Sequence, residues 1–219
     1  MIKVVIFDFD GVLVDSNEAW AEALGKAFEA TGVDKKVTYD DIKPHYGKPY
    51  VEVFRGVHPK CRNDKDTLEC MYKNFMEIAE SDEFSDSMNT IKGTRRFLGQ
   101  MKKKFRLAVG SGNSRRVLNR FLKKLKLEKY FEATVAGDEV RRGKPSPDLL
   151  LEAIRKLRVK PSEAVYVGDS ESDIIAAKKA GVKSIAVLTG ALDMKAAKKL
   201  KPDYIAEDVT KIQEALKCM

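Results

Sequence analysis

The sequence predicts an α/β fold, in which helices cover both faces of a parallel sheet and a helical lobe is inserted after the first strand. Three observations support this prediction. A β-branched strand pattern opens the chain, the stretch 16–88 has a helical pattern, and strand and helix patterns alternate from about residue 92 onward. Such alternation is typical of parallel sheets, because the crossover between two parallel strands usually carries a helix. With 219 residues, the chain is long enough for one such domain and a smaller lobe.

The first strand is predicted at 3–9, where the residues alternate and are rich in Val and Ile. A polar turn at 10–15 separates it from an amphipathic helix at 17–30. Residues 31–90 are then predicted to form helices, with no strand among them. The breaks between these helices fall at Gly and Pro residues, namely Gly32, Pro44, Gly47 and Pro59.

Helix and strand patterns alternate in the rest of the chain. Helices are predicted at 93–103, 114–125, 147–157 and 173–180, followed by a terminal helix. Strands are predicted at 105–109, 134–136, 164–167, 184–188 and 204–206. We therefore expect a doubly wound core domain made of residues 1–15 and 89–219, and an inserted helical domain at 16–88.

The net charge of +8 raises the question of nucleic-acid binding. The distribution of the charge argues against it. Lys and Arg cluster at 101–106, 115–126 and 195–201, where helical periodicity predicts solvated faces, and no aromatic side chains interleave them at a stacking spacing. We therefore expect no nucleic-acid partner. A positive surface would also attract small anionic substrates.

The sequence gives no sign of a membrane or secreted protein. No run approaches the roughly 18 apolar residues that a membrane span requires, and the first residues lack the small-residue cleavage site of a signal peptide. We therefore expect a cytoplasmic protein without a membrane partner, as a monomer or a homodimer. Cys61, Cys70 and Cys218 are odd in number and match no metal-ligand spacing, which predicts reduced thiols.

Polar residues recur at the predicted carboxyl ends of the strands, where ligands bind in open parallel sheets. Any one of these segments alone could be a helix N-cap, since Asp, Ser and Asn are common there. Four of them converging on one crevice favour a functional site. The segments are Asp8-Phe9-Asp10-Gly11, Gly110-Ser111-Gly112-Asn113, Gly143-Lys144-Pro145 and Gly168-Asp169-Ser170-Glu171-Ser172-Asp173.

The residue types in these segments predict a phosphate site with a bound cation. Asp8 and Asp10 lie two apart, so an extended chain directs both side chains to one face. Together with Asp169 they would repel a phosphate dianion, because unit charges about 4 Å apart interact by roughly 4 kcal/mol at an effective dielectric of 20. A few hard oxygen ligands that leave room for substrate and water fit Mg²⁺. The phosphate would be bound by Lys144, by the Ser111 hydroxyl and by the backbone N–H groups of Gly112 and Asn113.

The same four segments resemble the four motifs of the haloacid dehalogenase superfamily. They occur in the family's order and span nearly the whole chain, so the set is specific although each motif alone is modest. The phosphoglycolate phosphatase-like branch is the closest match, because it carries a helical cap after the first strand, and it implies a Rossmann-like core. The motifs are Asp-Phe-Asp-Gly-Val-Leu-Val-Asp-Ser at 8–16, Val-Gly-Ser-Gly-Asn at 109–113, Gly-Lys-Pro-Ser-Pro-Asp at 143–148 and Val-Gly-Asp-Ser-Glu-Ser-Asp at 167–173.

Asp8 and Asp10 carry the chemistry that the resemblance implies. Asp8 would attack phosphorus in line and form an aspartyl-phosphate, and Asp10 would protonate the leaving alkoxide and then deprotonate the attacking water. The dehalogenases of the superfamily lack a carboxylate at the second position, so Asp10 favours phosphoryl transfer. The β-phosphoglucomutase branch is the nearest rival, but it places a His where this chain has Trp20. A phosphatase acting on a small phosphorylated metabolite is therefore preferred to a sugar-phosphate mutase.

The resemblance also implies a metal site. Mg²⁺ would be held by Asp8, by the backbone carbonyl of Asp10 and by Asp169. Lys144 would bind the transferring phosphoryl group together with Ser111, and would counter the charge on Asp8. Asp173 would support the site without touching the metal. A plain role for Asp173 in the first turn of a helix is nearly as good an interpretation.

A phospho-accepting receiver domain, which is not a hydrolase, is an alternative from another class. It also combines carboxylates, Ser or Thr, and Lys on a parallel sheet. The helical insertion at 16–88 and the second aspartate, Asp10, argue against it.

The segment 44–49 lies between predicted cap helices and could meet the crevice. Lys48 is a candidate for binding an anionic substrate tail such as a carboxylate, and Arg55 and His45 are weaker candidates. A solvated turn with ordinary surface charge is an equally good interpretation of all three. Phosphoglycolate follows only from the family likeness, and sugar phosphates and nucleotides are open alternatives.

Overall fold

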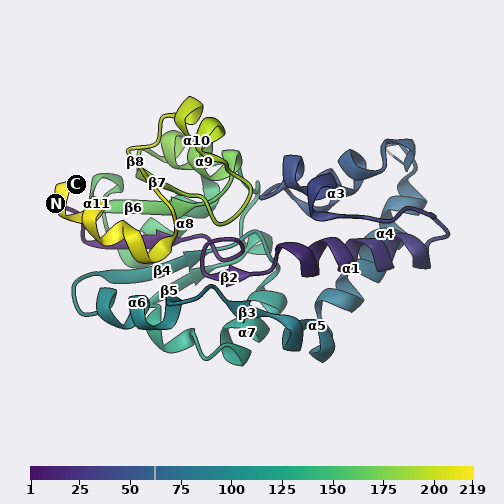
Figure 1. The fold of residues 1–219 in the computed structure, drawn as a ribbon, viewed down its shortest axis with the longest axis horizontal. Coiled ribbons are helices and arrows are strands. Elements are labelled where there is room, and N and C mark those ends of the chain that lie inside the picture. Colours follow the sequence, from purple (N-terminus) through teal and green to yellow (C-terminus); the bar gives the residue numbers. More distant parts are fainter. Residues whose placement is uncertain (62) are drawn as a thin grey trace.

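The core sheet confirms the predicted α/β fold. The computed structural model describes residues 1–61 and 63–219. The sheet consists of β1 (Val4–Phe7), β4 (Arg106–Gly110), β5 (Ala133–Val135), β6 (Ala164–Gly168), β7 (Lys183–Val187) and β8 (Tyr204–Ala206). All of these strands run parallel, in the order β5-β4-β1-β6-β7-β8 (Figure 1). The strand order therefore reverses at β1, where open parallel sheets form a crevice.

Helices cover both faces of the sheet, as the prediction of a doubly wound core requires. Val5 and Phe7 of β1 belong to one apolar cluster, and Val4 and Ile6 belong to the other. The first cluster packs against α6 (Thr94–Met101), α7 (Arg115–Lys124) and α11 (Ile212–Cys218). The second packs against α8 (Asp148–Leu157) and α9 (Glu171–Ala180). At the edge of the sheet, α10 (Met194–Leu200) packs against α9 and β7.

The chain between β1 and β4 forms a helical segment beyond the carboxyl ends of the strands (Figure 1). Its helices are α1 (Asn17–Ala30), α2 (Tyr39–Ile42), α3 (Tyr50–Val57), α4 (Lys65–Ala79) and α5 (Asp82–Ser87). Aromatic packing joins them, because the ring centroid of Phe75 in α4 lies 5.5 Å from Trp20 in α1 and 5.4 Å from Phe54 in α3. The predicted helices are thus confirmed, whereas the division into a core domain and a cap domain stays a prediction.

A short antiparallel ribbon, absent from the sequence prediction, connects the two ends of this segment. It pairs β2 (Val14–Asp15) with β3 (Asn89–Thr90). The prediction of a turn throughout 10–15, and of no strand within 31–90, is therefore wrong at these residues. Strands of two residues are too short to show a period, and their pairing joins positions far apart in the chain. The ribbon holds the start and the end of the helical segment side by side.

The first strand is shorter than predicted, because a side chain accepts a backbone hydrogen bond at its end. The first strand was expected to reach residue 9 but ends at Phe7, because the Phe9 N–H donates to the Asp8 carboxylate at 2.8 Å rather than to a neighbouring strand. Short 3₁₀ turns complete the connections, at Lys43–His45, Pro59–Cys61, Glu128–Tyr130, Gly137–Glu139, Pro161–Glu163 and Val209–Lys211.

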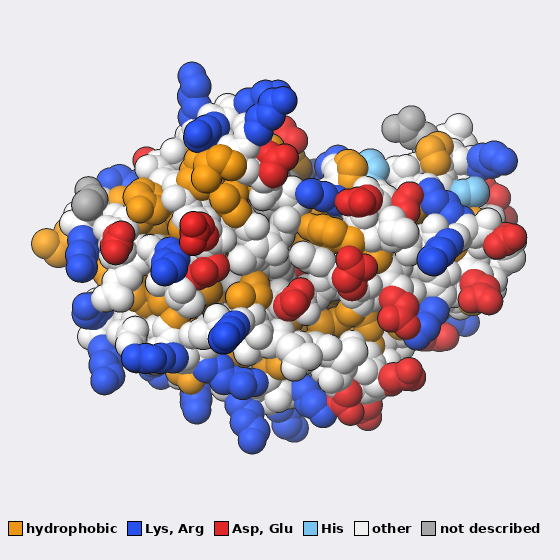
Figure 2. All heavy atoms as spheres, viewed as in Figure 1, with side chains coloured by type: hydrophobic (Ala, Val, Ile, Leu, Met, Phe, Trp, Pro, Cys, Tyr) orange, Lys and Arg blue, Asp and Glu red, His pale blue; other side chains and the backbone are white. Residues whose placement is uncertain are grey.

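The basic clusters lie mainly on the core. The clusters at 115–126 and 195–201 fall on or directly beyond α7 and α10, as predicted, but 101–106 forms the turn between α6 and β4 and is not a helix face. Lys and Arg gather around α6 and α7 in Figure 2, which also shows a notch between α10 and α3. None of the described helices combines the length and the apolar character needed to cross a membrane.

The cysteines that the structure describes are free thiols. Cys61 is buried and Cys70 is exposed. The Cys61 thiol donates to the carbonyl of His58 at 2.9 Å. The side chain of Cys218 lies outside the described part of the chain.

Candidate active site

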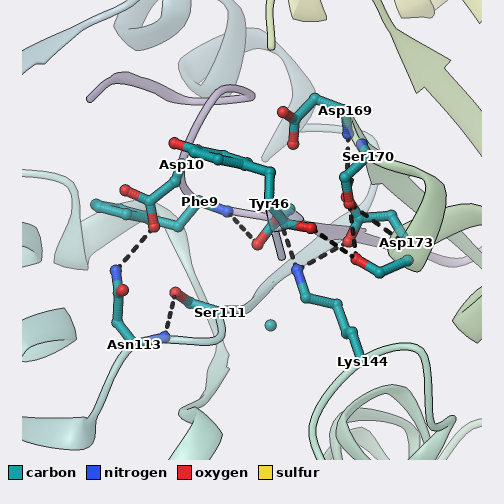
Figure 3. A network of polar contacts seen from close by, with 12 residues as sticks. Phe9, Asp10, Tyr46, Ser111, Asn113, Lys144, Asp169, Ser170 and Asp173 are labelled. Carbon is teal, nitrogen blue, oxygen red and sulfur yellow. Dashed lines mark hydrogen bonds and ion pairs between the residues drawn. The ribbon is translucent and has the colours of Figure 1, made fainter. Parts of the chain in front are cut away.

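Four of the predicted site residues meet at the carboxyl edge of the sheet (Figure 3). Asp8 follows β1, Ser111 follows β4 and Asp169 follows β6, and these strands are neighbours. Lys144 enters from the loop before α8. All four are buried, with exposed fractions between 0 and 4%. Because the strand order reverses at β1, Asp8 lies in the crevice that this topology opens.

Lys144 is the cation at the centre of the site. Its Nζ donates to Asp8 Oδ2 and to Asp173 Oδ1, at 2.8 Å in each case. It also lies 3.4 Å from the hydroxyl of Tyr166, which itself donates to Asp173 at 3.0 Å. Burial alone would lower the pKa of Lys144, but the two carboxylates outweigh it and raise the pKa above its ordinary value. Lys144 therefore stays charged.

The carboxylate of Asp173 is fully occupied by donors. Oδ1 accepts from Lys144, and Oδ2 accepts from the Asp169 N–H at 3.2 Å and from the N–H and hydroxyl of Ser170 at 3.0 and 2.6 Å. Oxygens of Asp173, Asp8 and Asp169 lie within 4.8 Å of one another, so distance alone would allow all three to hold a cation. Because its lone pairs are already used, Asp173 is better placed to orient Lys144 and the loop after β6.

Asp8 is a buried carboxyl group with a hydrogen-bond donor on each oxygen. Its Oδ1 accepts from the Phe9 N–H, and its Oδ2 accepts from Lys144. Burial raises the pKa of Asp8 to about 7, although Lys144 opposes this effect, and Asp173 and Asp10 add to it. A further positive charge beside Asp8 would favour its ionised form.

One oxygen of Asp169 has no partner. Its Oδ2 accepts from the Ala191 N–H at 3.0 Å, whereas buried Oδ1 accepts no hydrogen bond from any described residue. Two glycines make room for this carboxylate, because a Cβ at Gly11 or Gly190 would lie 2.5 or 1.7 Å from Oδ2. Burial and neighbouring carboxylates raise the pKa of Asp169 well above its ordinary value. An unpaired buried carboxylate oxygen is costly and marks a position where a ligand fits.

The donor set fits a hard divalent cation. Asp8 and Asp169 offer carboxylate oxygens, and the main-chain carbonyl of Asp10 accepts no backbone hydrogen bond from the described residues. Carboxylate and carbonyl oxygens are the ligands that Mg²⁺ prefers. The acidic side chains of the site also outnumber Lys144, so a second positive charge would balance them.

The carboxylate of Asp10 is held by side chains from three parts of the chain. Oδ1 accepts from the Ser16 hydroxyl at 2.7 Å and from the Trp20 indole N–H at 2.8 Å. Oδ2 accepts from the Asn113 amide at 2.8 Å. Asn113 in turn accepts, through Oδ1, a hydrogen bond of 2.6 Å from the Tyr50 hydroxyl. The helical segment is thereby linked to Asp10 through α1 and through α3.

These partners of Asp10 were only partly predictable. Asn113 was predicted as a phosphate-binding residue, whereas Trp20 entered only as the residue that replaces a His of the mutases. Ser16 and Trp20 are four positions apart, a spacing that places them on one face at the start of a helix, so this signal was available in the sequence. No sequence signal joins Tyr50 to Asn113.

A cavity connects this crevice to the helical segment. We call its two parts the polar end and the apolar end. The polar end is lined by Asp8, Asp10, Gly112, Asn113 and Lys144. The apolar end is lined by Trp20, Leu24, Ile42, Val53, Phe54 and Phe75. Between them lie Tyr46, Gly47, Lys48 and Tyr50.

The segment 44–49 does reach the crevice. The Ser172 hydroxyl donates to the carbonyl of Tyr46 at 3.4 Å, and a Cβ at Gly47 would lie 2.3 Å from the same hydroxyl oxygen. The Tyr46 ring lies among the carboxylates in Figure 3, and its buried hydroxyl has no partner among the described residues. Tyr46 was not predicted as a site residue.

Of the three predicted substrate-binding candidates in the helical segment, only Lys48 lines the cavity, and it is exposed. Arg55 instead pairs with Glu52 at 2.9 Å. The imidazole of His45 packs against Gly56, where a Cβ would lie 2.3 Å from the ring. The structure therefore does not bring Arg55 or His45 to the cavity.

Comparison with known proteins identifies the family. Residues 5–187 match the family model described as haloacid dehalogenase-like hydrolase. A phosphorylated carbohydrates phosphatase from Thermotoga maritima is 35% identical over 185 residues, which cover 84% of each chain. The pyrophosphatase PpaX of Bacillus velezensis is 30% identical over 216 residues, covering 95% of this chain and 94% of the relative.

The fold comparison agrees. A hydrolase of the haloacid dehalogenase-like family from Streptococcus pneumoniae superposes with a TM-score of 0.86 at 19% identity, covering 98% of both chains. The predicted resemblance to the superfamily is confirmed. Solved structures named as phosphoglycolate phosphatases from Lactobacillus plantarum and Haemophilus somnus share the fold. The prediction of a hydrolytic enzyme is confirmed by the family match. This chain belongs to the haloacid dehalogenase-like hydrolase family.

Proposed function

We propose that this chain is a Mg²⁺-dependent phosphatase that hydrolyses a small phosphate monoester through an aspartyl-phosphate on Asp8. One observation carries the proposal. A buried carboxylate, a buried hydroxyl and a buried ammonium from separate parts of the chain meet at one rim of the sheet. They lie next to an Asp169 oxygen that has no partner among the residues that the structure describes. Such a set can neutralise a phosphoryl group and hold a cation at the same time.

In this proposal, each residue of the polar end has a distinct task. Asp8 attacks phosphorus, Lys144 and Ser111 bind the phosphoryl oxygens, and the Gly112 backbone adds an N–H donor. The Asn113 N–H instead donates to the Ser111 hydroxyl oxygen at 3.1 Å and thereby orients it. Asp10 gives a proton to the leaving oxygen and later takes one from the attacking water. The hydrogen bonds from Ser16, Trp20 and Asn113 hold its carboxylate in place for both steps.

Asp8, Asp169 and the carbonyl of Asp10 would hold Mg²⁺, which when bound supplies positive charge to the phosphoryl oxygens. Asp173 orients Lys144 and does not touch the metal in this proposal, because its oxygens already accept five hydrogen bonds. The helical segment would act as a cap that excludes water from the site.

The names of the relatives suggest two substrate classes. One relative is named a phosphorylated carbohydrates phosphatase and another a pyrophosphatase. A phosphate monoester is the first candidate here, since Asp10 is positioned as an acid for an alkoxide leaving group. Inorganic pyrophosphate is the second candidate. A higher kcat/KM for pyrophosphate than for every monoester in a panel would favour it.

Hydrolysis of para-nitrophenyl phosphate tests the proposal. We expect turnover with Mg²⁺, none after EDTA treatment, and recovery when Mg²⁺ is returned. Asp8→Asn should abolish turnover, whereas Asp15→Asn, which changes an exposed carboxylate nearby in the chain, should retain it. Activity that survives in Asp8→Asn would rule out Asp8 as the nucleophile.

A further inference from the structure

We propose that the apolar end of the cavity binds the leaving group of the substrate, and that this leaving group is an uncharged aromatic or comparably apolar ring. The inference rests on the proposed phosphatase function and adds the substrate class. It assigns a binding role to Trp20, Phe75 and Val53, and it disfavours both phosphoglycolate and pyrophosphate.

The position of Asp10 fixes where the leaving group lies. An acid that protonates the leaving oxygen must be within hydrogen-bond reach of it. The Trp20 indole N–H donates to Asp10, and the Trp20 side chain also lines the cavity. The part of the substrate beyond the leaving oxygen therefore faces the wall that begins at Trp20.

That wall is made of packed rings. The ring centroids of Trp20 and Phe75 are 5.5 Å apart, those of Tyr50 and Phe75 are 4.8 Å apart, and those of Trp20 and Tyr50 are 5.9 Å apart. Trp20 and Phe75 are 6 and 3% exposed, so their orientation is fixed by packing. A flat apolar group is the ligand that such rings bind well.

The charges that line the cavity argue against an anionic leaving group. Lys144 is already paired with Asp8 and Asp173, and Lys48 is the only other cation among the described residues that line the cavity. Lys48 is exposed, whereas the apolar end is buried except for Val53, which is half-buried. A carboxylate or a second phosphate placed against Phe54 and Phe75 would lose its hydration without gaining a partner.

The hydrogen-bonding groups argue against a leaving group with many hydroxyls. The Trp20 N–H is used by Asp10, and the Tyr50 hydroxyl is used by Asn113. The Tyr46 hydroxyl is a buried group without a partner among the described residues, and it lies near the polar end. A sugar ring would leave hydroxyls unpaired at the apolar end, which is costly.

Binding of phosphonates tests the inference without requiring turnover. Benzylphosphonate, ethylphosphonate and phosphonoacetate share a phosphonate on a CH₂ group and differ in the group beyond it. By calorimetry at equal free Mg²⁺, we expect benzylphosphonate to bind about 10-fold or more tightly than each of the other two. Tighter binding of phosphonoacetate, or equal binding of all three, would overturn the inference.

Measurements of kcat/KM then test the inference and the proposed function independently. Among alkyl esters with similar leaving oxygens, kcat/KM should be highest for benzyl phosphate, above ethyl phosphate, glucose 6-phosphate and phosphoglycolate. A higher value for glucose 6-phosphate or phosphoglycolate would overturn the inference but leave the phosphatase function intact. Failure to hydrolyse any ester would overturn the proposed phosphatase function. The phosphonate affinities would still show whether the apolar end prefers an uncharged ring to an anion.

A charge placed in the apolar end should reverse the preference. In Val53→Arg, the affinity for benzylphosphonate should fall and that for phosphonoacetate should rise, each by about 10-fold. Glu52→Arg adds the same side chain on the exposed side of α3 and should leave the order unchanged. The same order of affinities in Val53→Arg as in the unmodified enzyme would count against the inference, and the phosphonate series in the unmodified enzyme does not depend on how the variant folds.

Discussion

The polar and apolar ends of one cavity are built on different principles. At the polar end, charged groups from distant parts of the chain are buried and tied to one another, as the contacts of Lys144 at 2.8 Å with Asp8 and Asp173 show. At the apolar end, rings from α1, α3 and α4 pack together, and none of the described residues of that lining is charged.

The difference separates two tasks of a phosphatase. The polar end is suited to the phosphoryl group, whose charge is the same in every phosphate monoester. The apolar end is suited to the leaving group, which differs from one ester to the next. Asp10 and Tyr50 connect the two ends. The Asp10 carboxylate accepts from Trp20 and from Asn113, and the Tyr50 hydroxyl donates to Asn113 while its ring packs against Phe75. We therefore expect changes at each end to affect different measurements.

Removing the acid should have the largest effect. In Asp10→Asn, kcat for ethyl phosphate should fall by about 10²- to 10⁴-fold, because the alkoxide can no longer be protonated. The nitrophenolate of para-nitrophenyl phosphate leaves without a proton, so stopped-flow measurement should still show a burst of about one equivalent. Equal losses in the first turnover of both esters would contradict the role of Asp10.

Removing the central cation should cost stability, in addition to the binding of the phosphoryl group. Lys144→Met leaves two buried carboxylates unpaired, and the free energy of unfolding should fall by about 3–5 kcal/mol in urea denaturation. Lys156→Met is the matched control, since this side chain is 30% exposed and lies 3.2 Å from Glu139, and it should cost less than about 1 kcal/mol. Similar losses in both variants would contradict the buried role of Lys144.

Breaking the link between the two ends should have a smaller effect. Tyr50→Phe removes the hydroxyl that donates to Asn113, and kcat should fall about 5- to 10-fold, as expected for one hydrogen bond. Tyr72→Phe, at an exposed tyrosine of α4, should leave kcat unchanged. A loss of thermal stability in Tyr50→Phe without any loss of kcat would show that the hydroxyl serves packing alone.

Removing the charge of Glu139 from its surface network of hydrogen bonds should have the smallest effect on stability. Burial would raise the pKa of Glu139, but hydrogen bonds from Arg115, the Ala136 N–H and Lys156 outweigh it and lower the pKa to about 2. A lowered pKa contributes stability above pH 4.5 that is lost as the pH falls toward 2. The difference in melting temperature between the unmodified protein and Glu139→Gln should therefore shrink between pH 6 and pH 3. A constant difference would contradict this assignment.

The two ends also differ in how far the sequence predicted them. Asp8, Ser111 and Asp169 were predictable because each directly follows a strand of a parallel sheet, and the sheet itself dictates that such positions meet. Lys144 was predictable from the Gly-Lys-Pro segment before a helix and from the family motif that it resembles. The helical content of 17–87 was predictable from periodicity, and the core strands were placed within one or two residues of their observed bounds.

The apolar end was not predictable, for a physical reason. Residues such as Trp20, Phe54 and Phe75 lie on different helices, and a buried aromatic residue has the same helical pattern whether it lines a cavity or fills a core. The orientation of helices in the lobe decides between these outcomes, and it depends on long-range packing. For the same reason, the sequence did not predict the contact of Tyr50 with Asn113. It also suggested Arg55 and His45 as substrate-binding residues, although both lie away from the cavity.

Trapping the phosphoryl group on the enzyme is the decisive measurement. During turnover of para-nitrophenyl phosphate, an acid quench followed by borohydride reduction converts an aspartyl-phosphate to homoserine. Mass spectrometry of the N-terminal peptide should then find that homoserine at position 8. Reduction at a different aspartate, or an unmodified peptide from a quench made during active turnover, would contradict the proposal that Asp8 carries the phosphoryl group.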